Sequence, residues 1–81
     1  MENEFDFGNA VNCLKMGKQV ARKGWNGKGM YIYRAVMDYQ TEEGKTKEFE
    51  PCIVMFTADK KFQPGWLASQ QDILADDWVL V

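Results

Sequence analysis

The sequence contains no histidine, two cysteines and two prolines, and these shortages exclude several classes of protein. Without histidine, the commonest general base and a frequent zinc ligand are missing. Cys13 and Cys52 lie far apart and form no CxxC pair, so both are predicted to be small hydrophobic residues of the core. We therefore expect no metal, no cofactor and no enzymatic activity.

The sequence also lacks a long apolar run and an excess of positive charge. The longest apolar run, residues 52–56, is far shorter than the 18 or so residues that span a membrane. The acidic start, residues 1–4, has no basic region typical of a signal peptide. The net charge of −2 disfavours a duplex nucleic acid or an anionic membrane as partner. We expect a protein of the cytoplasm.

What is present is a short chain rich in aromatic side chains. Its 81 residues accommodate one domain, residues 1–81. Surface scaling at this mass predicts that folding buries only about 63% of the surface of the extended chain. Aromatic residues nevertheless make up 14% of the sequence. We expect this surplus to favour association with copies of the same chain or with a flat ligand.

The pattern of apolar residues predicts an α+β fold. A helix is predicted over 7–16, capped by Asp6 and ended by Gly17. Strands are predicted at 19–22, 30–37, 52–57 and 77–81, and a polar hairpin at 39–50. Both faces of the 30–37 strand carry apolar groups, so both are expected to be covered. The order indicates a small, mainly antiparallel sheet with an N-terminal amphipathic helix and a short C-terminal helix.

One cluster of candidate functional residues lies between the first two predicted strands. Three glycines allow a sharp turn around Trp25, whose ring offers a large flat face, and Asn26 adds hydrogen-bonding groups. Arg22 and Lys28 flank the ring with positive charge, which suits a nucleotide-binding loop. The alternative is that Trp25 anchors the core and that residues 26–27 form a type I′ hairpin turn.

A second cluster surrounds the predicted C-terminal helix. Ser69, with Asp72 three residues on, resembles a capping box, and the helix start could hold a phosphate or a ribose hydroxyl. Trp66 comes just before it. The alternative is that Ser69 and Asp72 only cap the helix and Trp66 only packs. For the other carboxylates nearby, Asp76 and Asp77, solvated or capping roles are predicted.

These blocks together resemble a known family. The order of the segments 17–22, 24–31, 51–55, 57–59, 66–70, 72–75 and 77–78 is similar to that of the second type of phage Thoeris anti-defence protein. The similarity extends from Phe7 to Trp78, and the paired blocks around Trp25 and Trp66 are its most specific part. The sequence departs from the family pattern mainly in the segments 39–50 and 60–65, so no functional role is inferred from the family for residues there.

The resemblance implies a sponge for a signalling nucleotide. Members of that family bind a cyclic ADP-ribose isomer made by a bacterial immune sensor and hold it intact in the cytoplasm of the host cell. Some members also bind cyclic oligonucleotides, such as cyclic di- or trinucleotides, at a separate site. The family assembles as a homotetramer with ligand pockets at subunit interfaces.

The resemblance also implies roles for individual residues. It places Trp25 and Asn26 against the adenine or the ribose, and Trp66 as a wall of the pocket. Ser69, Gln70 and Asp72 are expected on hydroxyls or phosphates. Met30 and Arg22 complete the candidate ligand-binding residues, and Arg22 is included for its charge alone.

Two other functions compete with the sponge. One is a small interaction module that blocks a host protein through its aromatic surface, and the other is a nucleotide-processing enzyme. The absence of histidine and of a paired nucleophile and base disfavours the enzyme. A patch that only blocks a protein would not need the polar groups of Asn26, Ser69 and Gln70 beside the two tryptophans.

Overall fold

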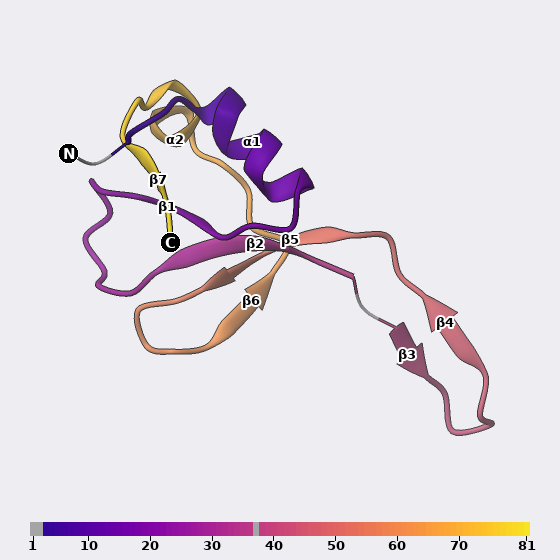
Figure 1. Ribbon diagram of the computed structural model, residues 1–81. Coiled ribbons are helices and arrows are strands. Elements are labelled where there is room, and N and C mark those ends of the chain that lie inside the picture. The colour runs from indigo at the N-terminus through magenta and orange to yellow at the C-terminus, as the bar shows by residue number, and fades with distance from the viewer. Residues whose placement is uncertain (1–2, 37) are drawn as a thin grey trace.

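The computed structural model describes residues 3–36 and 38–81 (Figure 1). In chain order its elements are α1 (Phe7–Lys15), β1 (Val20–Arg22), β2 (Tyr31–Ala35), β3 (Asp38–Gln40), β4 (Thr46–Glu48), β5 (Cys52–Phe56), β6 (Phe62–Pro64), α2 (Gln70–Leu74) and β7 (Trp78–Leu80). The α+β prediction is confirmed, with a helix near each end of the chain and antiparallel strands between them.

Five strands form the main sheet in the order β6-β5-β2-β1-β7, and all neighbours are antiparallel. β2 and β5 pair over their whole length, from Tyr31 opposite Phe56 to Ala35 opposite Cys52. The first and last strands, β1 and β7, also lie side by side, with Arg22 opposite Trp78. β2 is shorter than the predicted strand 30–37, whose last residue, Met37, lies outside the described residues.

Helix α1 begins and ends where the sequence predicts, within one residue. The Asp6 carboxylate accepts a hydrogen bond from the Asn9 backbone N–H at 2.9 Å. At the other end Gly17 takes a left-handed conformation, φ +81°, which only glycine adopts without strain. The Lys18 N–H then reaches back to the Cys13 carbonyl, as in a Schellman motif.

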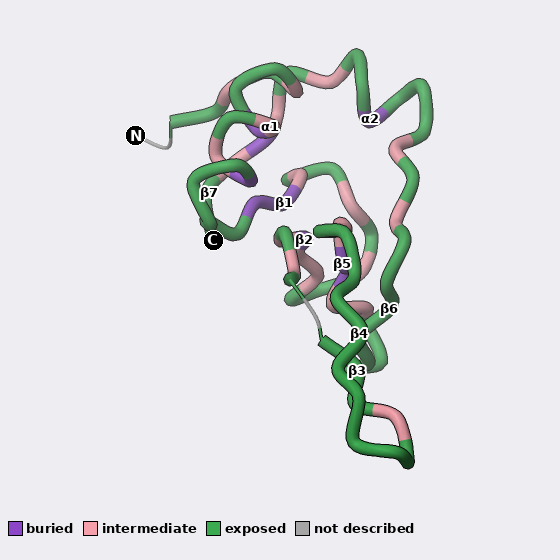
Figure 2. Tube along the Cα trace, turned by 90° about the vertical axis from the view of Figure 1, so that its right-hand side faces the viewer, coloured by how far each residue is buried: buried purple, intermediate pink, exposed green. Residues whose placement is uncertain are grey.

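The core lies between α1 and one face of the sheet. Ala10 and Leu14 of the helix pack on Val20, Ile32 and Trp78, all of which are buried. Figure 2 shows buried stretches on α1, β1 and β5 and, apart from them, on α2, while much of the remaining trace is exposed. The predicted core role of the two cysteines holds only in part, because both thiols are free and half-buried.

The opposite face of β2 is only partly covered, so the expectation that both faces are covered holds only in part: Val54, opposite Tyr33, is buried there. Tyr31 and Tyr33 are only half-buried there and pack against Phe56 and Phe62, with ring centroids 5.0 to 6.3 Å apart. Phe62 is 60% exposed. The chain has too few helical residues to cover a second face, so the aromatic rings shield one another instead.

The predicted polar hairpin is confirmed as the two-stranded sheet of β3 and β4. It projects from the main sheet, as Figure 1 shows. Its turn is closed by the Thr41 N–H on the Lys45 carbonyl at 2.8 Å, and Gly44 has φ +81°.

Candidate functional site

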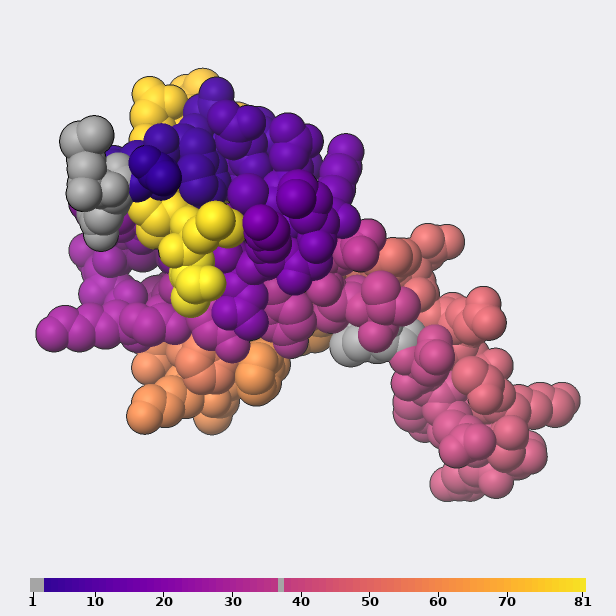
Figure 3. Space-filling view, viewed as in Figure 1, coloured from indigo at the N-terminus to yellow at the C-terminus, as the bar shows by residue number. Residues whose placement is uncertain are grey.

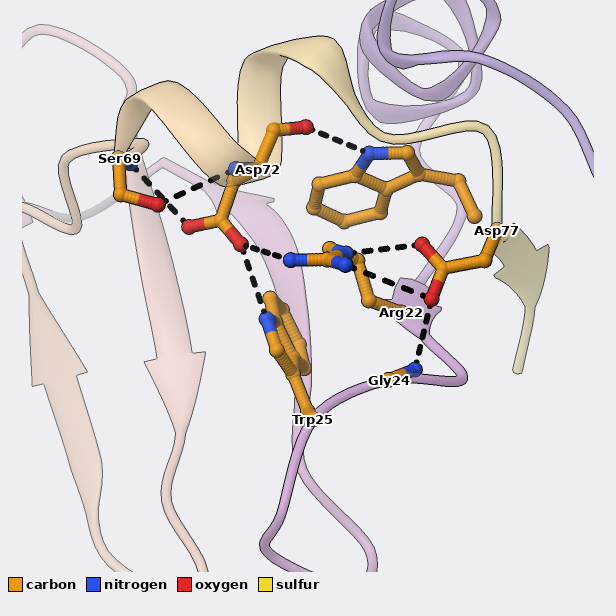
Figure 4. Close-up of polar contacts among 7 residues, drawn as sticks. Arg22, Gly24, Trp25, Ser69, Asp72 and Asp77 are labelled. Atoms are coloured by element: carbon orange, nitrogen blue, oxygen red, sulfur yellow. Dashed lines mark hydrogen bonds and ion pairs between the residues drawn. The ribbon is translucent and has the colours of Figure 1, made fainter.

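An ion-pair network joins β1 to the C-terminal helix and strand (Figure 4). Arg22, on β1, places its guanidinium between two carboxylates. Its Nη1 donates to Asp72 Oδ1 at 2.9 Å, and its Nε donates to Asp77 Oδ1 at 2.8 Å. The three side chains are only 12 to 26% exposed, so the pairs are shielded from water more than ordinary surface pairs.

The Asp72 carboxylate is the centre of this network. Its Oδ1 also accepts a hydrogen bond from Trp25 Nε1 at 3.1 Å. Its Oδ2 accepts from the Ser69 backbone N–H, and Ser69 Oγ in turn accepts from the Asp72 N–H, both at 3.1 Å. The predicted capping box of α2 is therefore confirmed. These bonds engage polar groups of Ser69 and Asp72, two of the three residues expected to meet a phosphate or a ribose hydroxyl.

The environment lowers the pKa of both carboxyl groups. Burial alone would raise the pKa of Asp72, but the hydrogen bonds from Arg22, Trp25 and Ser69 outweigh it and the net shift is downward. The hydrogen bond from Arg22 lowers the pKa of Asp77, and the Gly24 N–H, 2.7 Å from Asp77 Oδ2, acts in the same direction. The two carboxylates in return raise the pKa of Arg22. All three groups are charged near neutral pH.

Three tryptophan rings pack edge to face beside the network. Trp25 lies 5.4 Å from Trp78 and 6.1 Å from Trp66, measured between ring centroids. Trp78 is fully buried and donates from Nε1 to the Asp72 carbonyl at 2.9 Å. Trp25 and Trp66 are half-buried and pack against the core. The two rings from separate predicted clusters thus meet in one place.

The local backbone explains how the outer two rings reach this place. Gly65, with φ +81°, turns the chain so that its own N–H and that of Trp66 both bond the Ile53 carbonyl, at 2.9 and 3.0 Å. The Trp25 N–H bonds the Arg22 carbonyl at 3.3 Å in a tight turn after β1. Backbone hydrogen bonds to the main sheet therefore position both tryptophans, Trp25 through β1 and Trp66 through β5.

The structure brings together five of the eight candidate residues, namely Arg22, Trp25, Trp66, Ser69 and Asp72. Asn26 and Gln70 are exposed, on the loop between β1 and β2 and at the start of α2. Met30 is half-buried and packs partly against the core, next to the backbone of Gly27.

Two alternatives at this site are decided by the geometry. The type I′ turn at residues 26–27 is wrong, because it needs positive φ at both residues and neither has it. The core-anchor interpretation of Trp25 fits its packing and its bond to Asp72. The ring is half-buried and not fully enclosed, so part of its surface is accessible to a ligand.

Sequence reasoning missed the role of Asp77. The predicted solvated or capping role is wrong, since this carboxylate pairs with Arg22 and receives the Gly24 N–H. Only the complementary charge of Arg22 could have indicated the pair. Nothing local connects the two residues, because their contact depends on the pairing of β1 with β7.

An open pocket of about 290 Å³ is lined by Asn3, Phe5, Val79 and Leu80, none of which belongs to the candidate set. Within residues 3–36 and 38–81, no cluster of three or more acidic or thiol groups is arranged to hold a metal ion. In the same residues, no helix has the length and apolar character needed to cross a membrane.

The comparisons with known proteins identify the family of this chain. Residues 5–81 match the family model of the Thoeris anti-defense 2-like domain, and the chain belongs to this family. It is also similar to the protein named Thoeris anti-defense 2 of Bacillus phage SP01. The two are 36% identical over an alignment that covers all of this chain and 99% of the phage protein.

Proposed function

We propose that this protein is a phage anti-defence protein directed against Thoeris, which binds a signalling nucleotide of the cyclic ADP-ribose type and sequesters it without cleaving it. Membership of the Thoeris anti-defense 2-like family supports the anti-defence role. The observation that supports nucleotide binding is the contact between two half-buried tryptophans, Trp25 and Trp66, beside a polar network. Aromatic faces of this kind stack on nucleobases. The protein would act in the cytoplasm of the infected host.

In this proposal the candidate residues have two roles. Trp25 and Trp66 supply flat apolar surface for the base, and the exposed amides of Asn26 and Gln70 hydrogen-bond the ribose or the phosphates. Met30 adds apolar contact beside the Trp25 loop.

Arg22, Ser69 and Asp72 act by positioning. Their polar groups already bond one another, so their part is to hold Trp25 and the start of α2 in place. Rigidity of this kind lowers the entropy cost of binding.

The same network argues against catalysis. A general acid or base works best with a pKa near the operating pH. The carboxyl groups of Asp72 and Asp77 have lowered pKa values and their oxygens already accept hydrogen bonds. They are poorly suited to take a proton from water, so the proposed function is storage and not turnover.

The proposal includes assembly as a homotetramer with ligand pockets between subunits. Trp25 and Trp66 are half-buried in one chain, and a second copy packed beside them would close a pocket around the ligand. Cyclic di- or trinucleotides are a further ligand class to test in the same assay.

The competing function is the blocking of a host protein. It is favoured by one observation, the partly exposed aromatic face of the sheet, where Phe62 is 60% exposed beside Tyr33 and Phe56. Such a face suits contact with another macromolecule.

A binding and recovery experiment separates these functions. A cyclic ADP-ribose isomer is titrated into the protein by calorimetry, and the bound nucleotide is then released by heat and identified by mass spectrometry. We expect saturable binding and recovery of the intact cyclic nucleotide. Linear ADP-ribose in excess of the protein would favour an enzyme, and the absence of binding would favour the blocking module.

A matched pair of variants locates the site. Trp66→Ala is expected to weaken binding about 5- to 150-fold through loss of stacking. Leu67→Ala, whose side chain is 88% exposed on the neighbouring residue, is expected to bind as the wild type does. Equal affinity of the two variants would contradict the placement of the ligand beside Trp66.

A further inference from the structure

Residues 38–50 form a hairpin arm that stands away from the rest of the molecule (Figure 3). β3 and β4 pair with each other, and every residue of both strands is exposed. The arm contributes to a molecule 51 Å long and only 26 and 24 Å in its other two dimensions. A two-stranded hairpin without further packing is marginally stable in water, so the arm needs support that its own chain does not supply.

The arm carries an exposed aromatic pair. The rings of Tyr39 and Phe49 stack with centroids 6.5 Å apart and planes at 18°. Tyr39 is 54% exposed and Phe49 is 48% exposed. A large apolar pair on a projecting polar hairpin is typical of a contact with another protein surface.

The negative charge of the arm favours the body of a second copy of the chain as its binding partner. Residues 38–50 contain five acidic and two basic side chains, a net charge of −3. Because the whole chain has a net charge of −2, the remaining residues have a net charge of +1. The arm is therefore attracted to the body of a chain of the same sequence and is repelled by another arm.

The exposed surface of the chain is large enough for such a contact. Its accessible area is 6113 Å², whereas a compact monomer of this mass exposes about 5,000 Å². The excess of about 1,100 Å² is comparable with the roughly 800 Å² that each partner buries in a standard interface.

We propose that the arm of one chain docks on the body of a second copy through Tyr39 and Phe49, with the acidic residues of the arm facing basic groups of the partner. Because a twofold interface uses the same surfaces on both sides, each arm then contacts the body of the other chain. This inference rests on the proposed self-association and deepens it by naming the surface that produces it.

The test is the mass of the protein in solution without any nucleotide. The variant Tyr39→Ser/Phe49→Ser removes the aromatic pair, and we expect the dissociation constant measured by sedimentation and light scattering to rise at least about 100-fold. All three tryptophans lie outside residues 38–50, so their fluorescence reports whether the body remains folded. The control Leu74→Gln, which changes a side chain 79% exposed on α2, is expected to keep the mass of the wild type.

A second variant tests the electrostatic part. Glu42→Lys/Glu43→Lys changes the charge of the arm from −3 to +1 and leaves both aromatic rings in place. We expect weaker assembly, and in the wild type a dissociation constant that rises with salt.

The outcomes separate this proposal from the one on which it rests. A wild-type monomer at micromolar concentration would overturn both self-association and the arm contact. An assembled wild type whose mass survives the double serine variant would overturn the arm contact alone, as would an equal loss of mass in Leu74→Gln. An unchanged mass in the charge-reversal variant would overturn the electrostatic part. None of these results depends on whether a nucleotide binds.

Discussion

Replacing Asp72 by asparagine tests whether the polar network is a structural element. Asp72 is a buried residue, and its carboxylate accepts hydrogen bonds from Arg22 and Trp25 on Oδ1 and from the Ser69 N–H on Oδ2. Asparagine has nearly the same volume but carries an NH₂ donor in place of one oxygen. Either orientation of the amide directs this donor at another donor, and the negative charge opposite Arg22 is lost.

The cost follows from these contacts. Loss of a hydrogen bond to a charged group costs about 1.5–3 kcal/mol, and loss of an N-terminal cap about 1 kcal/mol. Arg22 keeps its second partner, Asp77, which limits the total to about 2–4 kcal/mol. Since 1 kcal/mol shifts the melting temperature of a domain of this size by about 4–8 °C, we expect Asp72→Asn to melt roughly 10–25 °C below the wild type.

The assay is differential scanning calorimetry at neutral pH, with Asp76→Asn as the matched control. Asp76 is exposed on the connection between α2 and β7, and its replacement is expected to shift the melting temperature by no more than about 3 °C. If Asp72→Asn melts as close to the wild type as this control does, the network does not stabilise the fold and the positioning role assigned to it is wrong.

Three further predictions follow from the same contacts. The pKa values of Asp72 and Asp77 are lowered, so the stabilisation from these carboxylates is fully present above the ordinary pKa of 3.8 and is lost as the pH falls through and below that value. The melting temperature should therefore drop in acid, and it should drop less steeply in Asp72→Asn. Trp25→Phe should keep nucleotide affinity within about 5-fold and lose about 1 kcal/mol of stability, because the hydrogen bond to Asp72 is lost. Trp25→Ala should lose about 2–3 kcal/mol of stability and most of the nucleotide binding. Equal calorimetric titrations of the two variants would exclude stacking of the nucleotide on this ring. In Gly24→Ala the added Cβ would lie 2.8 Å from Asp77 Oδ2, so denaturant titration should show a loss of about 1–3 kcal/mol, and an unchanged midpoint would contradict the close approach of backbone and carboxylate.

Features encoded within a few neighbouring residues could be predicted from the sequence. The helix over residues 7–15 follows from its apolar spacing, with Asp6 and Gly17 satisfying the free backbone groups at its ends. The capping box of Ser69 and Asp72 acts over three residues, so its two members alone indicate it. Strands β1, β2, β5 and β7 and the polar hairpin follow from alternating side chains and turn residues in the same way, whereas the short edge strand β6 was not predicted.

Features that join distant segments were decided only by the tertiary structure. Arg22 meets Asp72 and Asp77 because β1 pairs with β7, and no local pattern indicates that pairing. The same pairing makes Asp77, which was expected in solvent, an ion-pair partner, and it places Trp25 against Trp78. Trp66 reaches these rings from another strand, through its bond to the Ile53 carbonyl of β5. The sequence by itself determined which side chains were available for a site, but long-range packing determined which of them have their polar groups satisfied inside the protein and which remain exposed.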